Sequence, residues 1–493
     1  MTSQRNFTSD EYGVIVRDLL KTAGIPKDKI KGVIMSSVIP SLNYTMEHMC
    51  RDYFGLTPII VGPGVKTGLN VKADNPKEVG SDIIVDSVSA IHRYGKGTPI
   101  YQGGNNAGHT VVNERGKFIL NLLPSGILRP EVTCVMGNGM VIDLTHLHKE
   151  IASLREKGVV ITPDNLKISD RAIICMPYHV RQDCLEEDRL GDAKYGSTRR
   201  GIAPVYGDKY LKKVIRMGDL RFPEALDKHL DSIVEWKNLF IEKAYGSTPI
   251  DADDLKKHLK ELADEFLPYV TDTGVFLNES NKAGKRIMFE AQLGALRDID
   301  FGINPYTSSS NTIAAYAPIG AGVPNLKLDN VIGIMKAYSS CVGEGPFTVE
   351  AFGKFANDLR EAGGEYGAAT GRPRRVGAFD VVASRYGIRM QGADEIALTK
   401  LDVLSYLDAI PVCTAYEVGD KITTEFPFGE DLNIAKPEFT VLKGWKCDIS
   451  KCRKPEDLPK EAVDYIRFIE KATECKIKYV SVGSEREDYI VMY

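Results

Sequence analysis

The chain has 493 residues, of which 43% are hydrophobic and 26% charged, and its formal net charge is −4. This length is enough for about three domains, or for one large α/β unit with an addition, and the apolar fraction excludes a largely disordered chain. A sequence pI near 6.1 with both charge signs interspersed argues against nucleic acid as a partner. No apolar run reaches the ~18–20 residues that a membrane helix needs, and the N-terminus lacks the apolar core of a signal peptide, so we expect a cytoplasmic protein without membrane contact.

The first hundred residues predict alternating helices and strands. Ser9, followed by Asp10 and Glu11, favours a helix start, because a side-chain oxygen and acidic groups stabilise the free N–H groups of a first turn. Gly24 is a natural end for this helix. Further along we expect a strand over 31–39, a helix over 41–53, a strand over 58–62 and a helix over 80–94.

From about residue 99, glycine-rich polar segments alternate with apolar strands and long amphipathic helices. The pattern predicts helices over 223–244, 251–267 and 459–473, and strands over 172–176, 286–290, 331–338, 395–402 and 478–483. This order indicates an α/β fold, with a large and mostly parallel central sheet flanked by helices and with functional loops at the strand ends.

Cysteines and histidines give little sign of a metal centre. The nine cysteines are scattered, and an odd number argues against a disulfide framework. His146 and His148 form a His-x-His pair, but on a helix the two side chains point in different directions, which favours a surface position over a zinc site.

The densest chemical signal is QGGNNAGHT, residues 102–110. Its glycines allow the backbone to approach a ligand closely, and Asn105 and Asn106 supply donors and acceptors. His109 is an ionisable group whose pKa lies near neutrality. Taken alone, such a turn is more often a loop without a ligand.

Three later segments add cationic and acidic groups. YGSTRRGIAPVYGDK (195–209) and GAATGRPRR (367–375) are either solvated loops or clamps for phosphate and carboxylate, which suit guanidinium forks. TKLD (399–402) ends an apolar strand, and its Asp402 could accept two hydrogen bonds from the N1–H and the amino group of guanine.

In this order, the segments resemble the adenylosuccinate synthetase family over residues 100–493. The match also includes LLPSGIL (122–128), GNGMVID (137–143), YVTDT (269–273), DIDFG (298–302) and SVG (481–483). The resemblance implies a P-loop-NTPase-like fold and a cytoplasmic homodimer of AMP biosynthesis. It also implies the reaction IMP + L-aspartate + GTP → adenylosuccinate + GDP + phosphate, with Mg²⁺.

The resemblance further implies the roles of individual residues. His109 matches the catalytic acid, Lys209 a second catalytic residue, and the carbonyl of Gly108 a Mg²⁺ ligand. The residues implied to bind IMP are Asn106, Ala107, Gly108, His109, Thr198, Lys212, Gln292, Ser308 and Arg372. Those implied to bind aspartate are Ala368, Ala369, Thr370, Gly371, Arg372 and Arg374. Those implied to bind GTP are Gly108, His109, Thr110, Arg374, Lys400, Leu401, Asp402, Ser481, Val482 and Gly483.

Several positions depart from the family pattern. STRRG (197–201) stands where the family shows TTGRG, and Lys212 replaces an arginine that reaches IMP from the partner subunit. EAQLG (290–294) replaces EGAQG, so the glutamine that contacts IMP is either Gln292, shifted by one position, or is lost to Leu293. Ser308 replaces a threonine near the IMP phosphate.

The largest departure lies upstream, where the family has a strand and a GDEGKGK phosphate loop whose aspartate is both the general base and a Mg²⁺ ligand. Gly95–Gly97 and VGPGVKTG (61–68) imitate this loop poorly. The missing strand would be central in the sheet, so its absence would expose unpaired backbone and apolar surface. Two arrangements stay open: the strands of the N-terminal segment cover this gap, or they pack as a separate lobe.

Residues 9–98 instead resemble the middle of a type III pantothenate kinase, without that family's phosphate loops. Asp82 matches its proposed catalytic acid, although a helix-start carboxylate is the simpler interpretation. We therefore expect a chimera, with a kinase-like fragment over 1–98 and a synthetase-like domain over 99–493. Three functions stay open: an active synthetase, an inactive IMP-binding chimera and a pantothenate kinase. Because loss of a general base costs about 10²–10⁴-fold, we expect turnover at least ~10³-fold below that of a complete synthetase.

Overall fold

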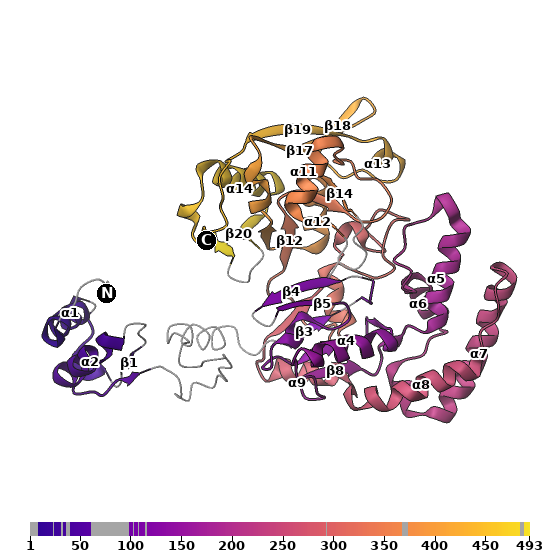
Figure 1. Ribbon diagram of the computed structural model, residues 1–493, viewed down its shortest axis with the longest axis horizontal. Coiled ribbons are helices and arrows are strands. Elements are labelled where there is room, and N and C mark those ends of the chain that lie inside the picture. Colours follow the sequence, from indigo (N-terminus) through magenta and orange to yellow (C-terminus); the bar gives the residue numbers. More distant parts are fainter. Residues whose placement is uncertain are drawn as a thin grey trace. The chain divides into compact units, whose positions relative to one another are not determined.

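The computed structural model describes residues 8–22, 24–30, 33–35, 40–60, 98–101, 103–106, 108–113, 116–291, 293–366, 373–483 and 488–493. The chain divides into two compact units, Met1–Lys96 and Gly97–Tyr493 (Figure 1). The predicted helix over 80–94, Asp82 and both imitations of a phosphate loop lie outside the described residues.

The described part of the first unit contains two α-helices and a small parallel pair of strands. Its elements are α1 (Ser9–Thr22), α2 (Pro40–Met49), which continues as a π-helical turn (Cys50–Phe54), β1 (Ile34–Met35) and β2 (Ile59–Ile60). The helix start is confirmed, but its cap is Thr8, whose hydroxyl accepts from the Glu11 amide while the Glu11 carboxylate accepts from the Thr8 amide. This reciprocal pair is a capping box one residue before the predicted cap. Tyr12, Met49 and Cys50 form the small buried core.

The second unit begins with a five-stranded parallel sheet in the order β10-β8-β6-β3-β11. Its strands are β3 (Thr98–Tyr101), β6 (Cys134–Met136), β8 (Leu166–Ser169), β10 (Val270–Thr271) and β11 (Ile287–Glu290). The helices of this half are α4 (Leu144–Glu156), α5 (Pro177–Leu190), α6 (Ile202–Leu211), α7 (Pro223–Asn238), α8 (Ala252–Phe266) and α9 (Thr273–Lys282).

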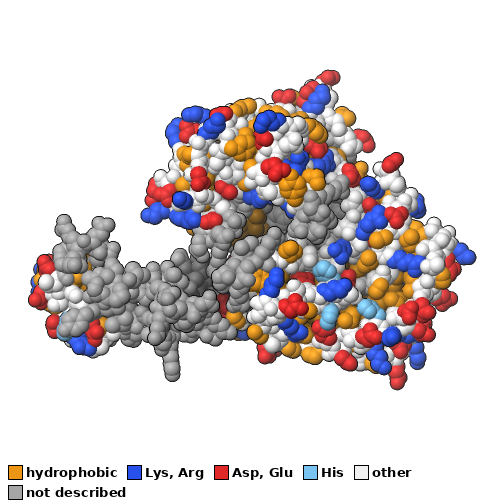
Figure 2. All heavy atoms as spheres, viewed as in Figure 1, with side chains coloured by type: hydrophobic (Ala, Val, Ile, Leu, Met, Phe, Trp, Pro, Cys, Tyr) orange, Lys and Arg blue, Asp and Glu red, His pale blue; other side chains and the backbone are white. Residues whose placement is uncertain are grey.

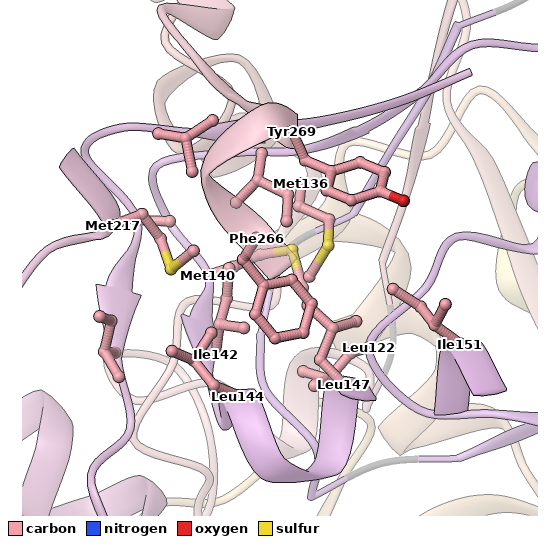
Figure 3. Packing of buried hydrophobic residues seen from close by; sticks show 14 of the residues in the cluster. Leu122, Met136, Met140, Ile142, Leu144, Leu147, Ile151, Met217, Phe266 and Tyr269 are labelled. Atoms are coloured by element: carbon pink, nitrogen blue, oxygen red, sulfur yellow. The ribbon is translucent and has the colours of Figure 1, made fainter. Parts of the chain in front are cut away.

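The largest hydrophobic core joins this sheet to α4, α7 and α8. Phe266 is fully buried and lies among side chains from several elements, with Met136 of β6 and Leu147 of α4 in the same cluster (Figure 3). Burial of side chains of this size stabilises the fold by about 1.5–3 kcal/mol each. The core thereby fixes the strand ends from which the polar loops emerge.

A second sheet has the order β12-β16-β20-β21, with its first three strands parallel. These strands are β12 (Ile332–Lys336), β16 (Glu395–Thr399), β20 (Lys476–Ser481) and β21 (Tyr489–Val491). Its core includes side chains of α11 (Gly353–Gly363), α12 (Val381–Gln391) and α14 (Lys460–Thr473). A mixed sheet comprises β15 (Phe379–Asp380), β17 (Ala409–Val418), β18 (Lys421–Thr423) and β19 (Lys436–Lys443).

The remaining elements are short. They are β4 (His109–Asn113), β5 (Gly116–Leu120), β7 (Val141–Ile142), β9 (Ile173–Ile174), β13 (Ser339–Cys341), β14 (Arg375–Gly377), α10 (Ala317–Gly320) and α13 (Glu430–Ile434). The helices predicted from periodicity over 251–267 and 459–473 are confirmed to within a residue. The helix over 223–244 is α7 followed by a π-helical turn, Leu239–Ala244.

The prediction of parallel sheets flanked by helices is confirmed. Among the described residues the parallel strands lie in two sheets, where β11 pairs only with β3 and β12 pairs only with β16. Both edges expose apolar side chains: Met288 on β11 is 54% exposed and Ile334 on β12 is 76% exposed.

The surface and the thiols agree with the sequence analysis. Basic and acidic side chains are interspersed over the face shown in Figure 2. All nine cysteines are free. None of the described helices is long and apolar enough to span a bilayer.

Candidate active site

The glycine- and asparagine-rich turn leads into the β4–β5 hairpin. Gly104 packs so closely on the core that a Cβ there would lie 2.7 Å from Ile202 Cδ1. Asn105 is buried: its amide nitrogen donates to Asp143 Oδ2 at 3.2 Å, while its Oδ1 has no hydrogen-bond partner. Asn106 is half-buried and Gly108 is exposed, beside the start of β4 at His109. Gln102 and Ala107, and the side chains of His109 and Thr110, lie outside the described residues.

A buried carboxylate supports the segment after this hairpin. Glu150 of α4 accepts hydrogen bonds from the backbone amides of Asn121 (2.8 Å), Leu122 (3.0 Å) and Leu123 (3.2 Å). Burial raises the pKa of Glu150, and the three amides oppose that shift. A Cβ at Gly108 would lie 2.8 Å from Asn121 Nδ2, so the hairpin packs closely against the side chain of Asn121.

The two histidines of the His-x-His pair have different partners, as their helical spacing predicts. His146 Nε2 lies 3.1 Å from Asn121 Oδ1, whereas His148 Nδ1 lies 2.6 Å from Glu265 Oε2. His146 therefore belongs to the support of the hairpin, and His148 to the exposed surface.

A second carboxylate fixes the STRRG loop. Asp183 of α5 accepts from Ser197 Oγ at 2.7 Å and from the Gly201 amide at 2.8 Å, and burial raises its pKa. Thr198, predicted to contact IMP, is exposed at the top of this loop. Arg199 has a left-handed backbone and pairs with Asp188 at 2.7 Å. The loop therefore presents Thr198 to solvent from a fixed base.

Helix α6 follows this loop and carries two predicted residues. Lys209 is partly buried, with Nζ 3.5 Å from the Tyr316 hydroxyl, and burial lowers its pKa. Lys212 ends α6 with a left-handed backbone and is exposed. The buried Asp208 anchors the helix through His179 at 2.9 Å and Lys237 at 2.7 Å.

The 290–312 segment contains the altered family motif. Leu293 is 40% exposed and has a φ of 77°, which is strained for a residue with a Cβ, and Gln292 lies outside the described residues. Ser308 is half-buried: its amide donates to the Arg297 carbonyl at 2.8 Å, and its hydroxyl lies 2.9 Å from that of Ser310. The structure thus places Ser308 in an ordered turn.

The carboxyl ends of β16 and β20 bring together the residues predicted to bind guanine. Lys400 follows β16, Ser481 ends β20, and the Leu401 amide donates to the Ser481 carbonyl at 3.2 Å. Asp402 begins the short 3-10 helix that follows β16, and burial raises the pKa of its carboxyl group. A Cβ at Gly483 would lie 2.3 Å from Asp488 Oδ2, so this position needs glycine.

Arg374 is the one described member of the residues predicted to bind aspartate. Its Nη1 donates to Glu365 Oε2 at 2.9 Å, and its Nε is buried without a hydrogen-bond partner. The other members, Ala368, Ala369, Thr370, Gly371 and Arg372, lie outside the described residues.

Three neighbours of Arg374 were not found from the sequence: Glu365, Lys336 and Tyr338. Lys336 ends β12, and Glu365 lies two residues before the glycine-rich GAATGRPRR segment, so a strand end and a charged residue beside a glycine-rich motif are the signals that could have indicated them.

A cavity of about 200 Å³ lies elsewhere, between the N-termini of α4 and α5 and residues of α8. It is lined by Asp143, Thr145, Cys175, Met176 and His258, among others, and it contains none of the predicted binding residues. The candidate site is therefore assigned from the strand ends and not from this cavity.

The strand ends of these parallel α/β sheets carry close-packed glycines, paired cations and a buried acid. This combination defines a class of nucleotide-binding enzymes. Comparison with known families identifies which family of that class the chain resembles. The model of the adenylosuccinate synthetase family matches residues 83–490. The chain belongs to this family of GTP-dependent ligases of AMP biosynthesis.

Individual relatives agree with this assignment. Adenylosuccinate synthetase of Caldanaerobacter subterraneus subsp. tengcongensis is 45% identical over 80% of this chain and 92% of its own length. That of Streptococcus gordonii is 44% identical over 78% of this chain and 90% of its own length. The structure of a fully ligated adenylosuccinate synthetase from Plasmodium falciparum superposes with a TM-score of 0.76 at 32% identity, over 82% of this chain and 95% of that one.

The resemblance of the N-terminal segment is also confirmed. The model of type III pantothenate kinase matches residues 1–126. The two family matches therefore overlap over residues 83–126.

Proposed function

We propose that this chain binds IMP, L-aspartate and GTP at the residues given above, and that it forms adenylosuccinate slowly for want of the GDEGKGK loop. The observation that carries the proposal is the contact between Leu401 and Ser481, which joins two segments far apart in sequence. It brings the TKLD and SVG segments together at one edge of a parallel sheet, where nucleotides bind.

The described residues support separate subsites. Thr198 and Ser308, each held in an ordered loop, would contact IMP. Arg374 would meet the carboxylate of L-aspartate and the nucleotide, since a guanidinium forms paired hydrogen bonds with such groups. Asp402 would accept from the guanine N1–H and amino group, which hypoxanthine only partly supplies. Lys209 would contribute a positive charge near the reacting groups, and His109 an acidic proton.

Magnesium is expected with GTP, but the described residues do not make a complete site. Gly108 offers a carbonyl oxygen, and no group of three acidic, histidine or cysteine side chains suited to a metal ion occurs among the described residues. Because Mg²⁺ is usually held by carboxylates and phosphates together, we derive no catalytic step from Gly108 alone.

The proposal also covers the assembly. Lys212 is exposed at the end of α6, where a long cationic side chain could reach a neighbouring molecule. We propose a cytoplasmic homodimer in which Lys212 approaches the IMP phosphate of the partner subunit. A lysine keeps the charge of the family arginine but cannot form its paired hydrogen bonds.

A second candidate function is IMP binding without turnover. The exposed apolar side chains of Met288 and Ile334 favour it, because within the described residues β11 and β12 each pair with a single strand, as they would without the strand that carries the phosphate loop and the base. Pantothenate phosphorylation is not favoured, because the sequence lacks both phosphate loops of that family.

The testing experiment follows adenylosuccinate formation by ultraviolet absorbance with IMP, L-aspartate, GTP and Mg²⁺, beside a titration of IMP binding. We expect measurable IMP binding and turnover at least ~10³-fold below that of the Caldanaerobacter enzyme. Asp402→Asn should lower the preference for GTP over ITP, whereas Asp408→Asn, at a surface pair with Lys446, should not. Turnover at an ordinary rate would contradict the proposal of a slow enzyme, and binding without turnover would establish the second candidate.

A further inference from the structure

Glu365 is a buried carboxylate at the base of the 367–372 loop. Its side chain is 0% exposed. Its Oε1 accepts from Lys336 Nζ at 2.7 Å and from the Tyr338 hydroxyl at 2.5 Å, and its Oε2 accepts from Arg374 Nη1 at 2.9 Å. Lys400 Nζ lies 3.6 Å from Oε1. One carboxylate therefore contacts groups from β12, from the segment after the loop and from the segment after β16.

Backbone hydrogen bonds also join the residues on either side of the 367–372 segment. The Arg374 amide donates to the Glu365 carbonyl at 2.9 Å, and Tyr366 forms an isolated antiparallel bridge with Pro373. Arg360 of α11 also donates from Nε to the Arg374 carbonyl at 2.9 Å. Glu365 therefore holds Arg374 through both its main-chain carbonyl and its side-chain carboxylate.

The charges in this cluster depend on Glu365. Three cations, on Lys336, Arg374 and Lys400, surround one buried carboxylate, and removing that carboxylate would leave them without a counter-charge. Burial alone would raise the pKa of Glu365, but hydrogen bonds from Lys336 and Tyr338 and the charges of Lys336 and Lys400 lower it to about 2. Glu365 is therefore ionised throughout the physiological pH range.

Lys400 connects Glu365 to the segment of the proposed guanine pocket. Its backbone is left-handed, with a φ of 59°, and its amine also donates to the Gly363 carbonyl at the end of α11. Asp402 lies two residues further along, in the same short segment between β16 and the next turn. Fixing the Lys400 side chain therefore restrains the position of the Asp402 carboxylate.

We propose that Glu365 is a positioning residue that couples Arg374 to the guanine pocket, because its one carboxylate holds Arg374 on one side and Lys400 on the other. This inference rests on the proposed function, since it takes Arg374 and the 400–402 segment as ligand-binding groups. Glu365 itself touches neither ligand.

The test compares Glu365→Gln with Glu350→Gln in the full chain. Glu350 pairs with Arg375 at 2.5 Å, so the control makes the same charge change beside the neighbouring arginine without reaching Lys400. The probes are the fluorescent nucleotide mant-GDP, and GDP and IDP as its competitors. In Glu365→Gln we expect mant-GDP binding to weaken about tenfold, as for the loss of a charge-assisted hydrogen bond, and the preference for GDP over IDP to fall. Glu350→Gln should change either quantity less than about twofold.

A gentler variant covers the case in which Glu365→Gln does not fold. Tyr338→Phe removes one hydrogen bond to Glu365 with almost no change of shape, and it should lower the GDP preference in the same direction by a smaller factor. Equal nucleotide affinity and equal GDP preference in the unchanged chain, Tyr338→Phe and Glu365→Gln would overturn the inference alone. Failure of the unchanged chain to bind mant-GDP would overturn the proposed nucleotide site and the inference together.

Discussion

Individual buried carboxylates hold several segments of this site in place. Glu150, Asp183 and Asp208 each hold a loop or a helix that presents predicted binding residues, and none of the three touches a ligand in the proposed arrangement. Buried charges are costly to leave without partners, so each substitution in such a pair has a large and specific effect.

Substitution of Lys237 tests how much one buried ion pair contributes to stability. It is 3% exposed and donates to Asp208 at 2.8 Å and to Gln182 at 2.8 Å. Lys237→Met should lower the free energy of unfolding by about 3 kcal/mol, because it leaves Asp208 as a buried charge without its cation. Urea unfolding measures the effect. Lys354→Met, whose side chain is 87% exposed, is the control and should unfold like the unchanged protein. Equal stability of the two variants would contradict this account.

His179 makes the same network sensitive to pH. It is fully buried, and burial lowers its pKa from 6.5 to about 4 although Asp208 opposes the shift. Between these pH values the unfolded chain binds more protons than the folded one. The stabilisation from neutral His179 is therefore complete above pH 6.5 and is lost as the pH falls towards 4.

The measurement compares free energies of unfolding across this pH range for the unchanged protein and for His179→Gln. The difference between the two proteins should shrink as the pH falls. His229→Gln, at an exposed position, should follow the unchanged protein at every pH. A constant difference between the unchanged protein and His179→Gln would show that His179 does not titrate as described.

At the scale of elements, the helix that carries Lys209 and Lys212 depends on how it begins. Gly201 precedes α6 with a φ of 76°, and a Cβ there would lie 2.7 Å from the Val180 amide nitrogen. Gly207, inside the same helix, has open space around its Cα. The two glycines therefore have opposite roles within a single helix.

Gly201→Ala should destabilise the protein by about 2 kcal/mol, from the strained backbone and the contact with α5. It should also weaken IMP binding, because Thr198 and Lys209 lie on either side of it. Gly207→Ala should instead stabilise the protein by about 0.5–1 kcal/mol, because alanine favours helix. Thermal unfolding and IMP titration check both variants, and a destabilised Gly207→Ala would be the contrary result.

The division of the described parallel strands into two sheets also depends on how these elements pair. Each parallel strand was predictable from its own apolar residues, but the number of sheets depends on which strands pair with one another. Met288 and Ile334 are apolar and exposed, on strands that each have a single partner within the described residues. Sequence periodicity indicates that a strand exists and does not indicate its neighbours.

For the molecule as a whole, the main question is whether the unit over Gly97–Tyr493 lacks only its phosphate loop. Replacing residues 1–99 with a strand, a GDEGKGK loop and a helix would supply the base, the phosphate contacts and the central strand together. We expect this chain to form adenylosuccinate at least ~10³-fold faster than the unchanged protein. The same graft with the loop aspartate changed to asparagine is the control, and it should lose most of that gain. Continued inactivity of the graft would place the defect at Lys212 and Leu293 instead.

The sequence by itself determined the family and the order of its motifs, and it supplied the residues that we propose for the guanine pocket. These are local features: TKLD and SVG each follow a strand, and the carboxyl ends of parallel strands meet at one edge. Only the tertiary structure showed that Glu365 joins Lys336, Arg374 and Lys400, and that the parallel strands form two sheets. Both depend on contacts between segments far apart in the chain, where a buried charge or an open strand edge is defined by its surroundings and not by its neighbours in sequence.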